Sequence, residues 1–411
     1  MGQSETTPKT TPMIRQYLEI KEAYPGYILF YRMGDFYEMF YSDAETASRE
    51  LEITLTARNK NEAEPVPMCG VPVKAAESYI GRLIDKGHKV AVCEQTEDPA
   101  AAKGLVRREV VRVVTPGMVV NNELLDARSN NFILAVVKNS RHCGLSCLDL
   151  STGTFRVAQT ADIDLVFDES LRIAPSEVLL PESAEDDADF ERLRRAFPET
   201  AITYVADDVF AHDAARQRLL QHFKTRSLEG FGCEGLLSGI SAAGALLHYV
   251  RETQKQQLVH LAAIETYALE NYLLLDDVSC RNLELLTNLQ NGTRQGTLLG
   301  VLDLTVTAMG GRMLKRWIRY PLICVEDIRA RQDAVAAALA HSSARKTIRE
   351  TLKSVADLER LGGKIAMGQA NARDLVALKR SIKALPEIFS AMAAFESPQF
   401  NVDESEFAAL Y

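Results

Sequence analysis

No part of the sequence is apolar enough to cross a membrane. Every apolar run is shorter than the roughly 18 consecutive residues that mark a membrane-spanning helix. Residues 1–11 are polar and lack the apolar centre that a signal peptide needs. The sequence therefore predicts no membrane segment, a short disordered tail over residues 1–11 and a cytoplasmic location.

Cysteine is scarce and scattered. The 411 residues include seven cysteines, and only Cys143 and Cys147 lie close together, with His142 beside them. A typical zinc site needs a second pair of ligands at matching spacing, and the sequence has none. We expect reduced cysteines in or near a core and no metal site.

The phosphate-binding loop of common ATPases is missing as well. The pattern G-x-x-x-x-G-K-[ST] occurs nowhere, and the run Gly310-Gly311-Arg312 does not fit it. We therefore expect this chain to hold no cofactor and to act as a binding protein rather than as an enzyme.

Positive charge is in deficit. The chain has 47 lysines and arginines against 56 acids, a net charge of −9. This balance argues against a protein held on nucleic acid by its overall charge. Acids concentrate in residues 182–191, whereas residues 103–112 carry Lys103, Arg107, Arg108 and Arg112 against a single acid. Any DNA binding must rest on local basic groups and on non-ionic contacts.

The length allows two or three domains, since a typical domain has about 150 residues. Residues 12–117 mix helix and strand patterns and predict a first α/β domain, followed by a linker over residues 118–129. Residues 130–255 begin again with strands and predict a second α/β domain. Residues 256–411 are almost purely helical. The predicted fold class is α/β plus α.

Local patterns place individual elements. Thr11 followed by Pro12 predicts a helix start, and the aromatic run at residues 27–31 predicts a strand that Gly34 and Asp35 end in a turn. Apolar residues at helical spacing predict helices around residues 283–289 and 352–358. The remaining expectations are helices at 43–51 and 75–86, a polar loop at 58–64, and strands at 53–56, 90–92, 110–114, 132–137, 144–150, 154–158, 178–180 and 202–204.

The most informative segment is residues 31–40, Tyr-Arg-Met-Gly-Asp-Phe-Tyr-Glu-Met-Phe. The predicted turn would put Phe36, Tyr37 and Glu38 at or just past the end of a strand. Taken alone, this triplet favours a core aromatic residue and a solvated surface acid. Its neighbours along the chain change that interpretation.

Residues 31–40 and several other segments resemble the MutS family of DNA mismatch-recognition proteins. The other segments are residues 64–72, 90–95, 110–117, 281–284, 307–314 and 357–361, in the order that the family has them. The resemblance implies a mismatch-recognition domain, a ribonuclease-H-like connector domain and an incomplete helical lever domain. In intact family members a DNA clamp and an ATPase that uses ATP and Mg²⁺ follow.

The resemblance also implies partners. Intact members bind double-stranded DNA with mismatches or small loops, form homodimers and have a downstream repair protein of the MutL type as a partner. For this chain alone we expect weak DNA binding, a weak dimer or a monomer, and a location with the DNA of the nucleoid.

The resemblance gives the triplet a specific role. Phe36 would match the aromatic wedge that enters the minor groove and stacks on a mispaired base, and Glu38 the carboxylate that hydrogen-bonds to that base. A flat ring can stack on any base, and a mispaired step is easier to unstack and kink than a paired one. Glu38 would be repelled by phosphates when ionised, and protonated it could donate to a purine nitrogen.

Basic residues near the triplet are candidates for contacts with the DNA backbone. The resemblance places Arg58 and Arg108 there, although either one taken singly is more often a solvated charge. Val71, Lys74, Arg107 and Lys103 are weaker candidates for DNA contact. At Val73 and Lys74 the chain departs from the family, which has tyrosine and histidine at these positions.

Two other functions remain open. Asp149, at a strand end before a Ser-Thr-Gly turn, would suit a metal-dependent nuclease if further acids joined it. Otherwise it is a turn acid, and the chain could also be an interaction scaffold that does not bind DNA. The basic run at residues 309–319 around Trp317 is more typical of a packed helix face than of a nucleic-acid stripe.

Overall fold

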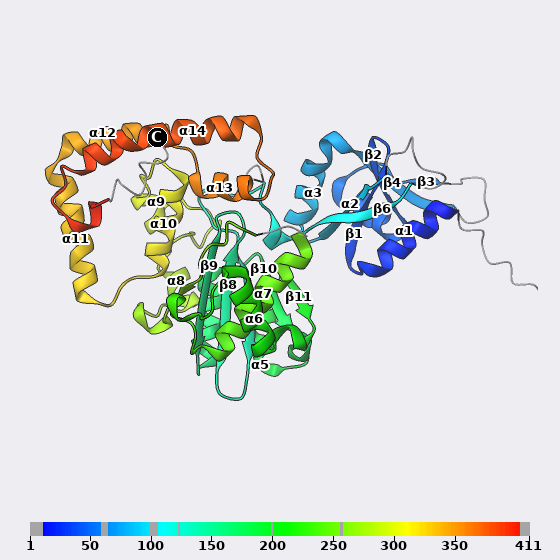
Figure 1. The fold of residues 1–411 in the computed structure, drawn as a ribbon, viewed down its shortest axis with the longest axis horizontal. Helices are drawn as coiled ribbons and strands as arrows, with labels where there is room; N and C mark the ends of the chain where they lie inside the picture. The colour runs from blue at the N-terminus through cyan, green and yellow to red at the C-terminus, as the bar shows by residue number, and fades with distance from the viewer. Residues whose placement is uncertain are drawn as a thin grey trace, which may run out of the picture. The chain divides into compact units, whose positions relative to one another are not determined.

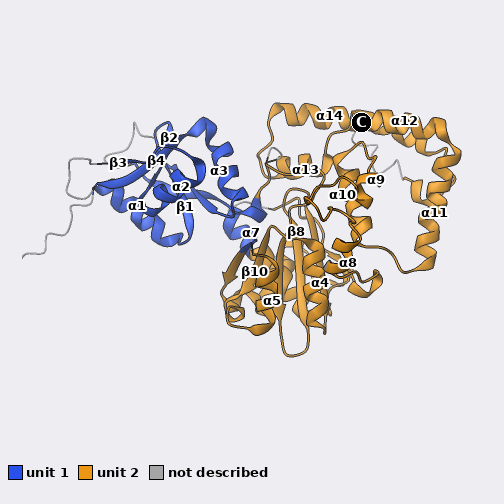
Figure 2. Cartoon of the chain, turned by 180° about the vertical axis from the view of Figure 1, so that it is seen from behind, with its two compact units in different colours: residues 1–118, 199–201, 249–256 blue, residues 119–198, 202–248, 257–411 orange. Residues whose placement is uncertain are grey.

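The computed structural model describes residues 11–58, 65–97, 106–121, 124–198, 200–254 and 258–402, whose elements are traced in Figure 1. Lys103, most of the expected N-terminal tail and most of the expected 58–64 loop lie outside these residues. The chain forms two compact units (Figure 2). Unit 1 contains residues 1–118, 199–201 and 249–256, and unit 2 contains residues 119–198, 202–248 and 257–411. The first stretch of unit 1 ends one residue after the predicted end of the first domain. Most of the predicted second domain and the predicted third domain share unit 2.

Unit 1 is built on a six-stranded mixed sheet in the order β3-β4-β2-β1-β5-β6. Only β1 and β5 are parallel to each other, and the other neighbours are antiparallel. The elements are α1 (Pro12–Ala23), β1 (Tyr27–Met33), β2 (Phe36–Phe40), α2 (Tyr41–Leu51), β3 (Thr56–Arg58), β4 (Val66–Pro72), the 3₁₀ turn η1 (Val73–Ala75), α3 (Ala76–Asp85), β5 (Lys89–Gln95) and β6 (Arg108–Val114).

The two faces of this sheet have different covers. On one face Tyr17 of α1 packs edge-on against Tyr31 and Phe40, in a core that continues to β5 and β6. On the other face α2 packs on β4, where the thiol of Cys69 donates to the carbonyl of Ala44, and α3 packs on β4 and β5. Because successive side chains of a strand point to opposite faces, the cover of each face decides which side chains of β2 and β4 stay exposed.

The sequence predicted most of unit 1, and the differences have local causes. Thr11 caps α1 as expected, with its hydroxyl accepting from the amide of Ile14. Strand β4 was missed because Pro67 and Pro72, which cannot donate to a ladder, weaken a strand pattern. The strand expected at residues 53–56 is wrong, since β3 starts only at Thr56. The triplet expected at a strand end is the start of β2 itself.

Unit 2 contains a second mixed sheet in the order β11-β10-β7-β8-β9-β12. Strands β7, β8 and β9 form an antiparallel meander, β10 is parallel to β7, and β12 is parallel to β9. The elements of this part of the chain are β7 (Ile133–Lys138), β8 (Cys143–Asp149), β9 (Thr154–Thr160), α4 (Ile163–Ile173), β10 (Glu177–Pro181), α5 (Ala188–Ala196), β11 (Ala201–Val205), α6 (His212–Phe223), α7 (Leu237–Gln254) and β12 (Glu265–Thr266). All strands expected here are present, and the likeness to ribonuclease H stays a prediction.

The rest of unit 2 is helical, and α12 and α14 run side by side in Figure 1. The helices are α8 (Asp277–Asn282), α9 (Leu298–Leu302), α10 (Ala308–Arg319), α11 (Val325–Ala340), α12 (Ser342–Leu352), α13 (Leu358–Ala366) and α14 (Ala372–Met392). Further 3₁₀ turns lie at Pro116–Met118 in unit 1 and at Glu182–Ala184, Asp207–Phe210, Glu229–Phe231, Leu269–Asn271 and Pro398–Phe400 in unit 2.

Two helix predictions in this part are wrong. Residues 283–289 follow α8 as turns, because Glu284 has a φ of 47° and the side chain of Asn288 bonds the backbone of Gln295. The apolar spacing at residues 352–358 spans a break, since α12 ends at Leu352 and α13 begins at Leu358. The α/β plus α fold class is confirmed.

Among the described residues, no helix is long and apolar enough to cross a membrane. The same residues contain no cluster of three or more histidine, cysteine or acidic side chains that could hold a metal. Cys143 and Cys147 are buried free thiols of β8, and burial raises the pKa of both, to about 12 for Cys147. These two cysteines are therefore unreactive core residues.

Candidate nucleic-acid interface

The candidate site begins at the hairpin between β1 and β2. Met33 pairs with Phe36 across a two-residue loop, and Gly34 at the first loop position has a φ of 60°. A positive φ at this position of a short hairpin loop favours glycine. The amide of Val73 donates to the carbonyl of Asp35 at 3.0 Å and ties the loop to the end of β4. The hairpin thus fixes the position of Phe36 as the first residue of β2, between Met33 and Pro72.

Phe36 and Glu38 lie on the same face of β2, the face that α1 covers only in part. Further along this face, Phe40 is packed beneath Tyr17 and is fully buried, whereas Phe36 is 48% exposed. The side chain of Glu38 is 21% exposed. A large apolar ring and a half-buried carboxylate therefore stand together beyond the edge of the α1 cover.

Gly70 keeps this surface open. It pairs with Glu38 across β2 and β4, and a Cβ added there would lie 3.3 Å from the carbonyl oxygen of Tyr37 and 3.7 Å from Cγ of Glu38. Any larger residue would also approach the ring of Phe36, whose Cδ1 is 3.9 Å from that position. Nothing in the sequence marks Gly70 as a site residue, because only the register of β2 against β4 puts it beside the triplet.

Tyr37 holds the strand between the two candidate residues. It points to the opposite face, where it is 6% exposed, and its hydroxyl donates to Glu94 of β5. Arg32 contacts the same carboxylate at 3.3 Å and lies over the ring of Tyr37. Burial, with the nearby Glu94, raises the pKa of Tyr37 to about 12. The middle residue of the triplet is thus an anchor.

Glu38 has a basic partner on the same face. The guanidinium of Arg58 in β3 lies 3.4 Å from Oε2 of Glu38 and is itself 37% exposed. Burial raises the pKa of Glu38 above its usual value, and the positive charges of Arg58 and Arg108 only partly oppose that effect. The carboxyl is therefore easier to protonate than an ordinary surface glutamate.

Arg108 is not available to DNA in the way that the sequence suggested. It is 7% exposed, and its guanidinium lies 4.8 Å from the centre of the Tyr31 ring. It donates to the carbonyl of Arg32 at 2.8 Å and to the side chain of Gln16 at 3.2 Å. These contacts hold the Arg108 side chain inside the protein, where it braces α1 and β1 against β6. The expectation that Arg108 contacts the DNA backbone is therefore corrected.

The expectation that the side chain of Val71 contacts DNA is also corrected. Its neighbour Gly70 shares the face of Phe36, so the side chain of Val71 points to the opposite face, where it is fully buried. Lys74 is exposed in η1, immediately after β4. Arg107 is exposed and pairs with Glu109 at 2.5 Å. The side chains of Lys74 and Arg107 remain accessible to a phosphate, whereas the side chain of Val71 is inaccessible.

Asp149 is committed to a turn. It is fully buried, and its two oxygens accept from Asn130, from the amide of Asn131 and from both the amide and the hydroxyl of Ser151. In the described parts of the chain it is not a member of any potential metal-binding group. These contacts favour the interpretation of Asp149 as a turn acid over that of a nuclease residue.

The chain matches known proteins over nearly its whole length. Family models match MutS domain I at residues 11–123, MutS domain II at residues 131–262 and MutS domain III at residues 278–410. The "DNA mismatch repair protein MutS" of Desulfosudis oleivorans is 56% identical over 391 residues, which are 95% of this chain and 44% of that protein. The protein of the same name from Desulforapulum autotrophicum is 55% identical over 93% of this chain and 44% of its own length.

The chain therefore spans less than half the length of the curated relatives that it matches. The three matched domains follow one another in the order of the first α/β segment, the second α/β segment and the helical segment. Phe36, Glu38 and Arg58 all fall within domain I. This chain belongs to the MutS family and carries its domains I, II and III.

Proposed function

We propose that this chain recognises mispaired or looped duplex DNA in mismatch repair, with Phe36 as a wedge in the minor groove and Glu38 as the partner of the displaced base. The observation that carries the proposal is the 48% exposure of Phe36 next to the loop of the β1–β2 hairpin, beside a carboxyl whose pKa is raised. Single exposed apolar side chains are common at protein surfaces, so the argument depends on where this ring lies, beside the hairpin loop and on the same face as Glu38 and Arg58.

The energetics favour a weakened step of the duplex. Stacking of one base on an aromatic ring contributes about 1–3 kcal/mol, whereas opening a base step costs a few kcal/mol. A mispaired step has already lost part of its pairing energy, so the remaining cost is lower there. The wedge therefore selects by deformability and needs no sequence code.

Glu38 and Arg58 complete the proposed site. While they stay paired at 3.4 Å, Arg58 partly neutralises the carboxylate. When DNA approaches, the phosphates compete for Arg58, and a protonated Glu38 can donate to a purine nitrogen. On a paired duplex no base accepts that bond, and an ionised Glu38 near the phosphates opposes binding.

Titration of fluorescent duplexes with this chain tests the proposal. We expect a duplex with one G·T mispair to bind more tightly than the matched duplex of the same sequence, with weak affinity for both. Equal affinity for the two duplexes, over a range of salt concentrations, would contradict mismatch recognition. Absence of binding to either duplex would favour a scaffold that does not bind DNA.

We predict that mismatch affinity rises as the pH falls. The pKa of Glu38 is already raised in the free protein, and nearby phosphates raise the pKa of a carboxyl further. Binding then takes up a proton, so affinity increases on going down through the bound-state pKa and levels off below the free-state pKa. Titrations of the G·T duplex between about pH 5 and pH 8 measure this slope. The same slope in Glu38→Gln would show that another group is responsible.

Further properties of intact family members are part of the same proposal. We propose that this chain binds DNA without catalysing a reaction or holding a cofactor. A MutL-type partner and a homodimer stay predictions for the intact protein. A weak dimer or a monomer, and a place with the nucleoid DNA in the cytoplasm, stay predictions for this chain. Calorimetry with ATP and Mg²⁺ would test whether this chain binds a nucleotide cofactor. Sedimentation would measure whether this chain is a monomer or a dimer.

A further inference from the structure

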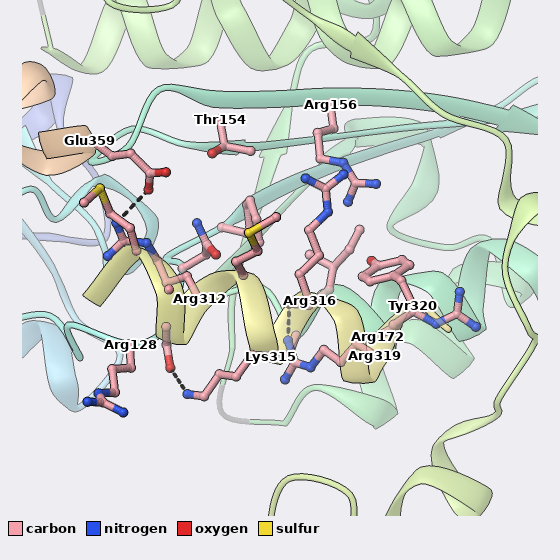
Figure 3. A pocket seen from close by; sticks show the side chains of 18 residues that line it. Arg128, Thr154, Arg156, Arg172, Arg312, Lys315, Arg316, Arg319, Tyr320 and Glu359 are labelled. Carbon is pink, nitrogen blue, oxygen red and sulfur yellow. Dashed lines mark hydrogen bonds and ion pairs between the residues drawn. The ribbon is translucent and has the colours of Figure 1, made fainter. Parts of the chain in front are cut away.

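Unit 2 contains a cavity of about 530 Å³ whose lining is rich in arginine. Arg156 comes from β9, Arg172 from α4, and Arg316 and Arg319 from α10. Figure 3 shows Arg156 and Arg316 extending toward one another from the strand and the helix, with Arg172, Arg319 and Tyr320 grouped at the same end of the cavity. We call these four arginines the arginine group.

The arginine group has fewer acidic partners than positive charges. Glu265 lies 2.5 Å from Arg316 and 3.5 Å from Arg156. Glu169 lies 3.1 Å from Arg172, and also accepts from the hydroxyls of two tyrosines. Arg319 has no ion pair within the described part of the chain and donates only weakly to the carbonyl of Ile173, at 3.4 Å. Four guanidinium groups thus share two carboxylates.

Several donors of the group are buried without a hydrogen-bond acceptor. Arg156 is 3% exposed and Arg172 is 6% exposed. Nε and Nη2 of Arg156 and Nε of Arg172 are inaccessible to solvent and form no hydrogen bond among the described residues, although Nε of Arg156 lies 3.5 Å from the carboxylate of Glu265. The ring of Tyr267 lies 3.8 Å from the guanidinium carbon of Arg156 and accepts no conventional hydrogen bond. A buried donor without an acceptor is costly, and a charged one more so.

We propose that this cavity binds a small phosphate-bearing anion. A phosphate group carries close to two negative charges at neutral pH and several acceptor oxygens, which would meet the charge excess of the arginine group. Planar guanidinium groups match phosphate oxygens in pairs. The volume is in the range of small-ligand pockets. The anion would join the sheet of domain II to α10 of domain III.

The shared chemistry is the phosphate group, and the source can be inorganic or a free nucleotide. Thermal unfolding and calorimetry of this chain with orthophosphate, pyrophosphate and AMP, each against sodium chloride at equal ionic strength, separate these sources. We expect saturable stabilisation, with an increase in Tm of about 2–4 °C at tenfold excess over Kd. AMP binding more tightly than orthophosphate would point to a nucleotide, and the reverse to an inorganic anion.

Three variants make the test specific. Arg316→Gln, at a side chain that is 43% exposed, should weaken phosphate binding about tenfold. Glu265→Gln removes the competing carboxylate and should strengthen binding, an effect that a merely structural role would not produce. Arg195→Gln, an exposed arginine of α5 that pairs with Glu191, is the matched control and should change nothing.

Two results would overturn the proposal. One is a Tm that rises equally with chloride and phosphate at the same ionic strength. The other is phosphate affinity that is unchanged in both Arg316→Gln and Glu265→Gln while the variants remain folded. Because DNA takes no part in these measurements, the outcome is independent of the mismatch-recognition proposal.

Discussion

Phe36→Ala is expected to weaken binding of a G·T duplex roughly five- to 150-fold, which corresponds to the 1–3 kcal/mol of one stacked base. Binding of the matched duplex should change little, because a stable step gives the ring no place to enter. The structure favours a clean result, since the ring is 48% exposed and its removal leaves no cavity in the core. Fluorescence anisotropy with both duplexes measures the two affinities.

Two further variants separate stacking from general apolar contact. Phe36→Leu keeps an apolar side chain but has no ring, so it should behave more like alanine than like phenylalanine. Leu18→Ala truncates another exposed apolar side chain of unit 1, 42% exposed on α1, and should leave both affinities unchanged. If Phe36→Ala retained the full mismatch preference, the aromatic wedge would be the wrong mechanism.

Glu38→Gln is expected to bind the matched duplex up to about fivefold more tightly, because one partly exposed charge contributes up to about 1 kcal/mol. Glutamine keeps the shape of glutamate and an N–H donor, so the hydrogen bond to a purine can persist. The mismatch preference should therefore shrink mainly through the gain on matched DNA. The change also frees Arg58, which lies 3.4 Å from the carboxylate, to meet a phosphate.

Salt distinguishes this explanation from a loss of structure. If repulsion by the phosphates is the cause, the difference between Glu38→Gln and the original protein on matched DNA should decrease as salt increases. Glu45→Gln, which removes one exposed acid of α2, is the control for net charge. A gain of the same size in Glu45→Gln would assign the effect to net charge, and no gain in Glu38→Gln would argue against a selective role for Glu38.

Arg108 shows what single-residue reasoning could not decide. A basic segment next to the proposed DNA-binding hairpin suggests phosphate contacts, and Arg107 is indeed exposed. Arg108 instead braces elements far apart in the chain, since Gln16 is 92 residues away and Arg32 is 76 residues away. Charge and spacing are local properties, whereas such contacts exist only in the folded sheet.

The sequence by itself determined the family, the order of α/β and helical segments and the helix cap at Thr11, because motifs, hydrophobic periodicity and capping are written locally along the chain. It put Phe36 and Glu38 only at or just past the end of a strand, and the structure showed that both belong to β2, where alternating side chains give them one face. Only the tertiary structure decided that this face is left open at Phe36 and closed at Phe40, and that Val71 points away. The physical reason is that exposure depends on where α1, α2 and α3 pack, and packing is set by contacts between residues that are distant in sequence.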